Sequence, residues 1–382
     1  MRLEESWGLL GMKSDWRKYK LEDVCSRLSS GKGISSKYLS KEGNYPVFGG
    51  NGIRGYTATS NFKGDCAIIG RQGAYCGNVR YFAGEAYMTE HAVVVCANDE
   101  SCTRYLAYLL SNMNLGRLSG QSAQPGLSVK TLAKQEITIP QRDEQIKISE
   151  LLGIFDEKIK QNEQINDNLF QQMEALYKSW FTDFTPFGGE RPLSWKKSDI
   201  YSIADIIYGA PFASKLFNTD GEGIPIIRIR DLKDQTFVTY TTENHPKGHL
   251  IKPGDIVVGM DGEFRPYIWG NTEAWLNQRV CIFANKRPEG KAFVLFTIKP
   301  LLYRIEQTQV ATTVIHIGKK DYDAFELYLP DNDTLDRFDE ITSPMIDQIV
   351  VNCLANKRLA ELRDALLPRL MSGELDVSEV DI

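Results

Sequence analysis

Two short glycine motifs have the residue types of phosphate chemistry. Residues 50–55, Gly-Asn-Gly-Ile-Arg-Gly, match the G-x-G-x-x-G pattern of dinucleotide-binding turns, and residues 31–33 place a lysine between two glycines. A pyrophosphate site also needs a helix directly after the glycines, but the segment that begins at Tyr56 has no helical periodicity. The lysine segment lacks the other residues of a phosphate-binding loop. Neither motif predicts a nucleotide site.

The histidines do not predict a metal site. His245 and His249 have the i, i+4 spacing of a metal-binding pair, but Pro246 and Gly248 between them exclude a helix. We therefore expect two surface histidines in a loop. The sequence has no nucleophile elbow and no carboxylate pair beside an obvious base. We predict no catalytic and no metal-ligating residue, which is more typical of a binding protein or adaptor.

The elements that surround these motifs occur twice in the chain. Residues 127–140 and 317–330 share one pattern, end in Pro140 and Pro330, and each lead into a long amphipathic stretch. The similarity extends upstream, where Trp16 corresponds to Trp195, Pro46-Val-Phe to Pro225-Ile-Ile, and Glu85-Ala-Tyr to Glu273-Ala-Trp. Such a period is too long for a solenoid and indicates duplication of a domain and its helix.

Each repeated unit reads as a mixed α/β domain. Short β-rich runs, 66–69 and 92–96 in the first unit and 255–258 and 279–283 in the second, are separated by glycine-rich turns. Helical stretches at 103–112 and 293–306 lie between them. We predict an α/β (α+β) fold with two tandem, similar domains related by a pseudo-twofold axis.

Both long stretches predict helices with an apolar seam. In residues 142–181 the seam positions advance by alternating steps of four and three, which is heptad spacing, and Asn162 and Asn166 lie in the seam as register-fixing polar residues. For the second helix we expect Ser343 as N-cap and Pro344 in the first turn. The predicted spacer residues are Leu152, Phe155, Ile159, Leu169, Met173 and Leu176, with Ile349, Leu359, Leu362 and Leu366. We expect the helices to pair as an antiparallel coiled coil; two separate coiled coils that recruit other chains are the alternative.

The charge is distributed unevenly. The net charge is −5, but residues 16–140 contain 15 Lys/Arg against 9 Asp/Glu, and residues 194–330 contain 17 against 16. The acidity lies in residues 141–193, with 6 against 10, and in residues 331–382, with 5 against 12. A basic first unit suits phosphate-binding surfaces, whereas the nearly even second unit is equally compatible with ordinary solvated faces.

Other features concern the cellular compartment. The seven cysteines are odd in number and lack CxxC spacing, which is typical of thiols in a reducing cytosol. No apolar run is long enough to span a membrane, and the N-terminus lacks a signal-peptide pattern. We expect a cytoplasmic protein without a membrane partner.

Distinctive motifs occur in both domains and both helices: Tyr45-Pro-Val-Phe-Gly-Gly-Asn-Gly-Ile-Arg-Gly-Tyr56, residues 69–79, 89–93, 224–232 and 276–280, residues 155–159 and 175–181, and Leu362-Arg-Asp-Ala-Leu-Leu-Pro-Arg-Leu-Met-Ser-Gly-Glu-Leu375. Together and in this order, these motifs resemble those of a known family, the specificity subunits of type I restriction–modification systems. The resemblance covers roughly residues 16–377.

The resemblance implies a function in DNA recognition. Two target-recognition domains would each read one half of an asymmetric, split site in double-stranded DNA. The helices would hold the domains apart and dock two methyltransferase (modification) subunits, which the restriction/translocase subunits join. No cofactor would bind this chain, because S-adenosylmethionine, ATP and Mg would belong to the partner subunits.

Polar residues in loops are the candidates for DNA contact, because Arg, Asn and Gln can bind base edges and Lys or Arg can bind phosphates. For each one alone, a turn residue or an internal salt bridge is the alternative. In the first domain they are Asn51, Arg54, Tyr56, Arg71, Gln72, Tyr75, Gln121, Ser122 and Gln124. In the second domain they are Arg228, Arg230, Asp231, Arg265, Tyr267, Asn277, Gln278 and Arg279.

The predicted organisation is a leader (1–15), a first recognition domain (16–141), a spacer helix (142–185), a second recognition domain (186–332) and a second helix with an acidic tail (333–382). Two other functions stay open. A duplicated protein-binding scaffold would bind with little dependence on salt, whereas DNA binding weakens steeply as salt rises. An unrecognised DNA-modifying enzyme should show an Asn/Asp-Pro-Pro-Tyr/Phe motif, and none is present.

Overall fold

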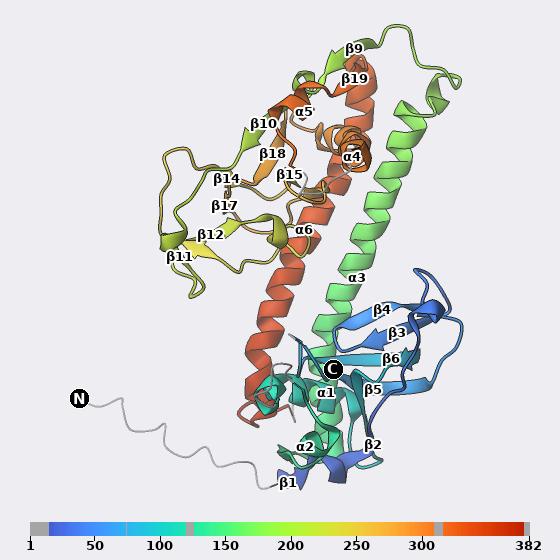
Figure 1. The fold of residues 1–382 in the computed structure, drawn as a ribbon, viewed down its shortest axis with the longest axis vertical. Coiled ribbons are helices and arrows are strands. Elements are labelled where there is room, and N and C mark those ends of the chain that lie inside the picture. The colour runs from blue at the N-terminus through green and yellow to red at the C-terminus, as the bar shows by residue number, and fades with distance from the viewer. Residues whose placement is uncertain (1–14, 74, 120–125, 309–315, 378–382) are drawn as a thin grey trace, which may run out of the picture. The chain divides into compact units, whose positions relative to one another are not determined.

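The structure is a computed structural model that describes residues 15–73, 75–119, 126–308 and 316–377. The chain divides into two compact units: residues 1–157 with 360–382, and residues 158–359. Each unit combines one mixed α/β domain with parts of two 40-residue helices, α3 (Arg142–Phe181) and α6 (Asn332–Met371) (Figure 1). The first unit is therefore assembled from both ends of the chain, whereas the second is continuous in sequence.

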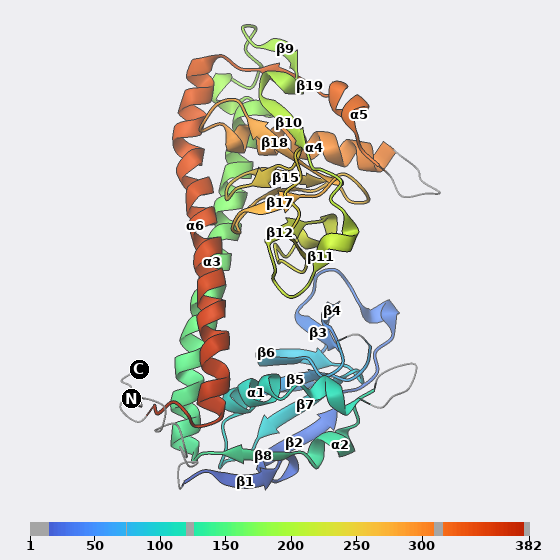
Figure 2. The same ribbon diagram turned by 90° about the vertical axis from the view of Figure 1, so that its left-hand side faces the viewer.

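The first domain is built on one six-stranded sheet in the order β2-β7-β5-β6-β3-β4. Its neighbouring strands are antiparallel except for β3 and β6, which run parallel. Helix α1 (Thr103–Asn112) packs beside β5 and β7 (Figure 2). The strands are β2 (Cys25–Ser30), β3 (Tyr45–Gly49), β4 (Gly52–Thr57), β5 (Phe62–Gly70), β6 (Val79–Met88) and β7 (Ala92–Ala97).

The central strands of this sheet are buried on both faces. Ile69, Val93 and Val95 belong to the core beneath α1, whereas Ile68 and Val94 belong to the core on the opposite face. Successive side chains of a strand point to opposite faces, so a continuous apolar run is what a doubly covered strand requires. This explains why the run Val93–Cys96 shows no polar alternation.

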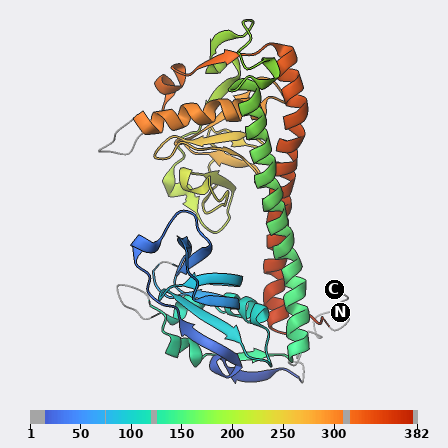
Figure 3. The same cartoon turned by 90° about the vertical axis from the view of Figure 1, so that its right-hand side faces the viewer.

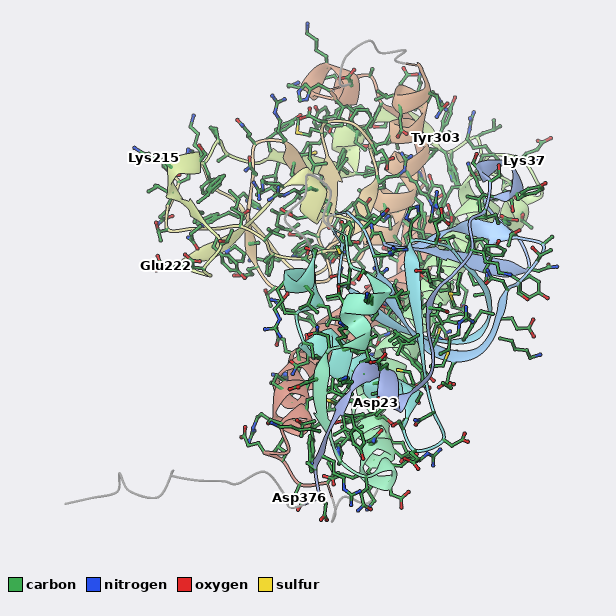
Figure 4. All side chains as sticks on the ribbon, turned by 60° about the horizontal axis from the view of Figure 1, so that its bottom comes forward. Asp23, Lys37, Lys215, Glu222, Tyr303 and Asp376 are labelled. Carbon is green, nitrogen blue, oxygen red and sulfur yellow. The ribbon has the colours of Figure 1, made fainter. Side chains whose placement is uncertain are left out.

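The second domain contains two sheets, in the orders β10-β18-β15-β16 and β11-β13-β12-β17-β14. Helix α4 (Lys291–Thr308) packs on the first of them. Lys215 comes shortly before β11 in the sequence and Glu222 shortly after it, and both lie at the left-hand edge of this domain in Figure 4. The strands are β10 (Ala204–Tyr208), β11 (Phe217–Asn218), β12 (Ile224–Ile227), β13 (Tyr240–Thr241), β14 (Leu250–Ile251), β15 (Ile256–Gly259), β16 (Pro266–Ile268), β17 (Ala274–Leu276) and β18 (Val280–Asn285).

Each domain also has a short two-stranded ribbon and a one-turn helix that lead into the long helix. In the first domain β1 (Arg17–Lys20) pairs with β8 (Glu136–Ile139) after α2 (Val129–Ala133), and in the second β9 (Lys196–Asp199) pairs with β19 (Glu326–Leu329) after α5 (Lys319–Asp323). The predicted tandem, mixed α/β architecture is confirmed.

The internal repeat is visible in single backbone hydrogen bonds. The amide of Thr89 donates to Phe48 O at 3.0 Å, and the amide of Asn277 donates to Ile227 O at 3.2 Å. The amide of Gly31 donates to the first residue of β7 at 3.1 Å, and that of Gly209 to the first residue of β18 at 3.0 Å. The parallel pairing of β3 with β6 recurs as that of β12 with β17. Equivalent positions in the two domains can therefore be named residue by residue.

The two domains differ where a single strand of the first is broken in the second. The long β6 pairs with both β5 and β3, but its counterpart is divided into β16 and β17 by residues 269–273. This break packs against α6 within the second unit. A Cβ at Gly270 would lie 2.6 Å from Cβ of Cys353, and Lys357 Nζ donates to Asn271 Oδ1 at 2.8 Å. Only glycine permits this close approach.

The two long helices run antiparallel beside each other in each unit (Figure 3). In the second unit Asn162 Nδ2 donates to Asn356 Oδ1 at 2.7 Å, and Asn352 Nδ2 donates to Asn166 Oδ1 at 2.8 Å. One helix advances four residues while the other goes back four, which is antiparallel pairing. Further along, the rings of Trp180 and Phe338 lie 5.8 Å apart. The predicted antiparallel coiled coil is confirmed.

The predicted seam is correct on α3 but wrong at one position on α6. Leu152 and Met173 are buried, and the other four predicted residues of α3 are half-buried: Phe155, Ile159, Leu169 and Leu176. Leu362, however, is 48% exposed, and the adjacent Arg363 lies in the seam, where its Nη1 is 2.5 Å from Asp156 Oδ1. A search for apolar residues misses Arg363, because the partner that neutralises its charge, Asp156, belongs to the other helix.

The start of α6 also differs from the prediction. The helix begins at Asn332 rather than after Ser343, and Pro344 lies within it. Asp331 is the actual cap, because its Oδ1 accepts a hydrogen bond from the amide of Thr334 at 2.9 Å. Proline inside a helix removes one backbone hydrogen bond, and here the surrounding packing of Phe338 and Ile346 keeps the helix continuous.

Candidate functional site

Three segments of the first domain converge at the end of β5. They are the turn between β3 and β4 at residues 49–52, the loop that begins at Gly70, and the residues just before β7. A Cβ at Gly70 would lie 2.3 Å from Gly50 O and 2.6 Å from Tyr75 O, so only glycine fits there. The amide of Arg71 donates to His91 O at 3.0 Å, and the amide of Leu127 donates to Arg71 O at 2.9 Å. We call this the first loop cluster.

Several of the sequence-predicted residues lie in this cluster. Asn51 is exposed in the turn, and Gln72 is exposed and forms an isolated backbone bridge with Gly126. Tyr75 is 49% exposed in the same loop. Arg54 folds back over Gly49, where a Cβ would lie 2.5 Å from its Cδ. Gln121, Ser122 and Gln124 lie outside the described residues.

Two other predicted residues have mainly structural surroundings. Arg71 is partly buried, and its guanidinium donates to Leu127 O and to Ser30 Oγ, both at 3.2 Å. It therefore ties the loop to β2. Tyr56 lies at the far end of β4, where its backbone exchanges hydrogen bonds with Ser40. The fold does not bring Tyr56 to the first loop cluster.

Sequence reasoning missed Arg80 and His91. Arg80 is exposed on β6, and a Cβ at Gly52 would lie 2.7 Å from its Nη1, so the guanidinium lies over the turn. His91 precedes β7 and lies 3.3 Å from the carboxylate of Glu90. No local motif marks either residue, because the strand register alone brings them to the turn.

The second domain forms an equivalent second loop cluster. It contains the one-turn 3-10 helix Ile229–Asp231 after β12, the loop that starts at Met260 after β15, residues 277–279 before β18, and His316. The amide of Met260 donates to Arg279 O at 2.9 Å, and the amide of Ile317 donates to Met260 O at 2.9 Å. These bonds match those of Arg71 and Leu127 in the first domain. Both clusters therefore use one backbone scaffold.

Asp231 was predicted to contact DNA, and this prediction is corrected because its side chain is buried. The side chain of Asp231 is 2% exposed, accepts the amide of Arg228 at 3.0 Å and lies within 4 Å of the guanidinium groups of Arg228 and Arg230. Burial lowers the pKa of Arg228, and the neighbouring charge of Arg230 adds to this shift. Arg228 also donates to Thr239 Oγ1. Asp231 thus orients two arginines and does not reach the surface, whereas Arg230 is 60% exposed there.

The other predicted residues of the second domain also divide into those held by internal contacts and those exposed to solvent. The guanidinium of Arg265 binds the carboxylate of Glu306 on α4, and this hydrogen bond raises the pKa of Arg265 and lowers that of Glu306. Tyr267 is partly buried on β16. Asn277 is partly buried, and Gln278 and Arg279 are exposed just before β18. The exposed polar groups therefore lie at the 3-10 turn and at residues 278–279.

Equivalent positions of the two clusters display different side chains. On the shared backbone, Gln72 corresponds to Asp261, and Gly126 corresponds to His316. His91 corresponds to Arg279, since each carbonyl accepts the amide that follows β5 or β15. The common scaffold therefore presents different polar groups in the two domains.

The chemistry available at these clusters is hydrogen bonding and charge. Among residues 15–73, 75–119, 126–308 and 316–377, no group of three or more His, Cys, Asp or Glu side chains could hold a metal ion. All seven cysteines are free, and burial raises the pKa values of Cys25, Cys66 and Cys281 to about 12, which disfavours the nucleophilic thiolate. In the described part of the chain, none of the helices combines the length and apolar character needed to cross a bilayer.

Comparison with known proteins identifies the scaffold. The family model of the type I restriction modification DNA specificity domain matches the chain twice, at residues 13–171 and 192–350. The chain is 45% identical over 112 residues to the type I restriction enzyme EcoprrI specificity subunit of Escherichia coli, a match that spans 29% of this chain and 28% of that protein. It is 25% identical over 311 residues to the MjaIX specificity subunit of Methanocaldococcus jannaschii, covering 75% of this chain and 72% of the relative.

The fold also has a solved counterpart. The crystal structure of a type I restriction-modification system S subunit from M. genitalium aligns over 95% of this chain and 97% of its own length, with a TM-score of 0.57 at 17% sequence identity. The sequence-based prediction of a specificity subunit rather than a catalytic one is confirmed by the family model and the relatives. The chain belongs to the type I restriction–modification specificity family and carries two copies of its DNA specificity domain.

Proposed function

We propose that this chain reads an asymmetric, bipartite site in double-stranded DNA, with each domain recognising one half-site through its loop cluster. One observation carries the proposal: a single backbone scaffold occurs twice and displays different polar side chains at equivalent positions, such as Gln72 and Asp261. Identical scaffolds approach DNA in the same way, and different side chains then select different bases.

The catalytic steps are assigned to partner subunits. We propose that the helix pair docks two methyltransferase (modification) subunits, and that restriction/translocase subunits join this assembly in the cytoplasm. S-adenosylmethionine, ATP and Mg would then bind the partners. Membership in the specificity family, whose DNA specificity domain matches residues 13–171 and 192–350, supports this division of labour.

The test compares binding of the complex, assembled with its methyltransferase subunits, to duplexes that carry changes in one half-site at a time. Methylated adenines mapped in host DNA with and without the gene supply the two half-site sequences. We expect each domain's variants to alter one half-site only, and affinity to fall steeply as salt rises. Binding that is insensitive to salt and sequence would instead support a protein-binding scaffold.

A further inference from the structure

Two side chains of the second loop cluster, those of Arg279 and His316, meet the carboxylate of a third residue, Asp261. Asp261 follows β15, Arg279 immediately precedes β18, and His316 precedes α5. His316 Nδ1 lies 2.6 Å from Asp261 Oδ1, and Arg279 Nη1 lies 3.6 Å from the same oxygen. The backbone joins these segments as well, through a bridge between Asp261 and His316 and through the amide of Met260, which donates to Arg279 O. The cluster is therefore fixed by both its main chain and its side chains.

The distances indicate which hydrogen bonds form among Asp261, Arg279 and His316. Arg279 Nη1 also lies 3.2 Å from His316 Nδ1. A ring nitrogen cannot accept a hydrogen bond from arginine while it donates one to a carboxylate. Because the contact with Asp261 is much the shorter, we assign the Nδ1 proton to the bond with Asp261. His316 then orients the carboxylate, and the carboxylate holds the guanidinium by charge.

One edge of the Arg279 guanidinium has no partner among the described residues. The side chain of Arg279 is 53% exposed, whereas that of Asp261 is 25% exposed. Among the residues that the structure describes, both partners of the guanidinium meet it at Nη1. The Nε–Nη2 edge, with its two parallel donors, therefore has no partner among the described residues, on a side chain that is half-exposed. This is the geometry with which arginine binds O6 and N7 of guanine, and prior orientation reduces the entropy lost on binding.

The first domain has no such arrangement on the same scaffold. Its equivalent positions hold Gln72, His91 and Gly126, which supply neither a carboxylate nor an arginine. The trio in the second domain is thus a local addition to a shared backbone. Asp205 and Lys286 form a comparable ion pair at 3.3 Å at the other end of β18, and this pair provides a matched control.

We propose that Arg279 is a specificity-determining residue that binds one guanine in the half-site of the second domain, and that Asp261 and His316 are positioning residues that act through Arg279. The inference rests on the proposed recognition of DNA. It adds the base class, the residue that reads it and the two side chains that aim that residue.

The experiment uses the complex with its methyltransferase subunits and a duplex set in which each base pair of the second half-site is changed singly. Arg279→Lys keeps the positive charge but loses the two parallel N–H donors of the guanidinium. We expect the preference for one G·C pair over the other base pairs to fall about 5- to 150-fold. Asp261→Asn and His316→Gln should lower the preference for that same base pair. Asp261→Glu, which keeps a carboxylate, should lower it less than Asp261→Asn does. The double variant Arg279→Lys/Asp261→Asn should lose no more than Arg279→Lys alone. Asp205→Asn should change nothing.

Three results would overturn the inference. Equal weakening for every duplex, with a smaller dependence on salt, would make Arg279 a phosphate contact. Effects of Arg279→Lys and Asp261→Asn that add, or that fall on different base pairs, would remove the positioning role. No loss with Arg279→Lys would show that this arginine reads no base. Reading of the first half-site serves as the internal check on folding, and a wild-type complex that discriminates neither half-site would instead refute the proposed function itself.

Discussion

Asn162 donates its side-chain amide to the side-chain oxygen of Asn356 at 2.7 Å, within the apolar seam of the two long helices. Asn162 is 3% exposed, and the neighbouring layer repeats the arrangement with Asn352 and Asn166. A buried asparagine pair stabilises one register of a coiled coil, because any shift leaves polar groups unpaired in the seam. This register fixes which residues of α3 and α6 face each other.

The asparagine pair leads to the first prediction. Asn162→Leu alone should destabilise the protein by about 1–3 kcal/mol, because Asn356 loses its buried partner. Asn162→Leu with Asn356→Leu should recover that loss or exceed wild-type stability, since two leucines match the rest of the seam. Urea unfolding of the single and double variants measures the coupling energy. Additive losses in the double variant would contradict the pairing.

A second prediction concerns the glycines that end β5 and β15. Gly70→Ala should disrupt the first loop cluster and its half-site recognition, because the added Cβ would meet the backbone oxygens of Gly50 and Tyr75 at 2.3 and 2.6 Å. Gly259→Ala is the matched control. Its Cβ would meet side-chain atoms rather than backbone, with Ile229 at 3.2 Å and Leu232 at 3.4 Å, and should cause less loss than Gly70→Ala. Thermal unfolding and half-site binding of the two variants should separate them, and equal effects would argue against the backbone contact.

A third prediction separates two arginines that are neighbours in sequence. Arg230→Ala removes an exposed guanidinium and should alter recognition of the second half-site with little change in stability. Arg228→Ala should mainly lower stability, by about 1–3 kcal/mol, because its partly buried guanidinium donates to Thr239 Oγ1 as well as neutralising Asp231. Calorimetry together with single-half-site binding distinguishes the two roles. Loss of first half-site recognition by either variant would be inconsistent with separate domains.

A fourth prediction concerns pH and the cap of α6. The amide of Thr334, which donates to Asp331, lowers the pKa of this carboxyl. A lowered folded-state pKa adds stability that is present above the unfolded value near 4 and is lost as pH falls through the lower folded value. Asp331→Ala should therefore cost about 1 kcal/mol at neutral pH, and the difference in Tm from wild type should shrink below about pH 4. A constant difference across this range would exclude the charged cap.

The sequence predicted those features that repeat locally. The matched segments around Pro46 and Pro225 revealed the duplication because both form the parallel strand that pairs with β6 or β17. The heptad spacing of α3 located its inward face from Leu152 to Leu176 because helix geometry repeats over that whole length.

Prediction failed where a residue's environment comes from distant segments. Arg363 occupies the seam because Asp156 of the other helix neutralises it, so the apolar Leu362 was chosen wrongly. Asp231 was predicted to lie at the surface because it is a charged residue next to arginines in the sequence. Only the fold shows that it is buried beneath them. Arg80 reached the first loop cluster through the pairing of β5 with β6, which no local pattern encodes.

The composition of the first unit has a consequence for synthesis of the protein. Its core contains Trp16 and Leu21 from the beginning of the chain and Leu370, Met371 and Val377 from residues 360–377. A nascent chain can bury the continuous second unit, residues 158–359, before these last core residues have left the ribosome. Until then the first unit exposes apolar surface that proteases and chaperones recognise. A chain that stops before residue 360 would therefore lack part of the core of its first recognition domain.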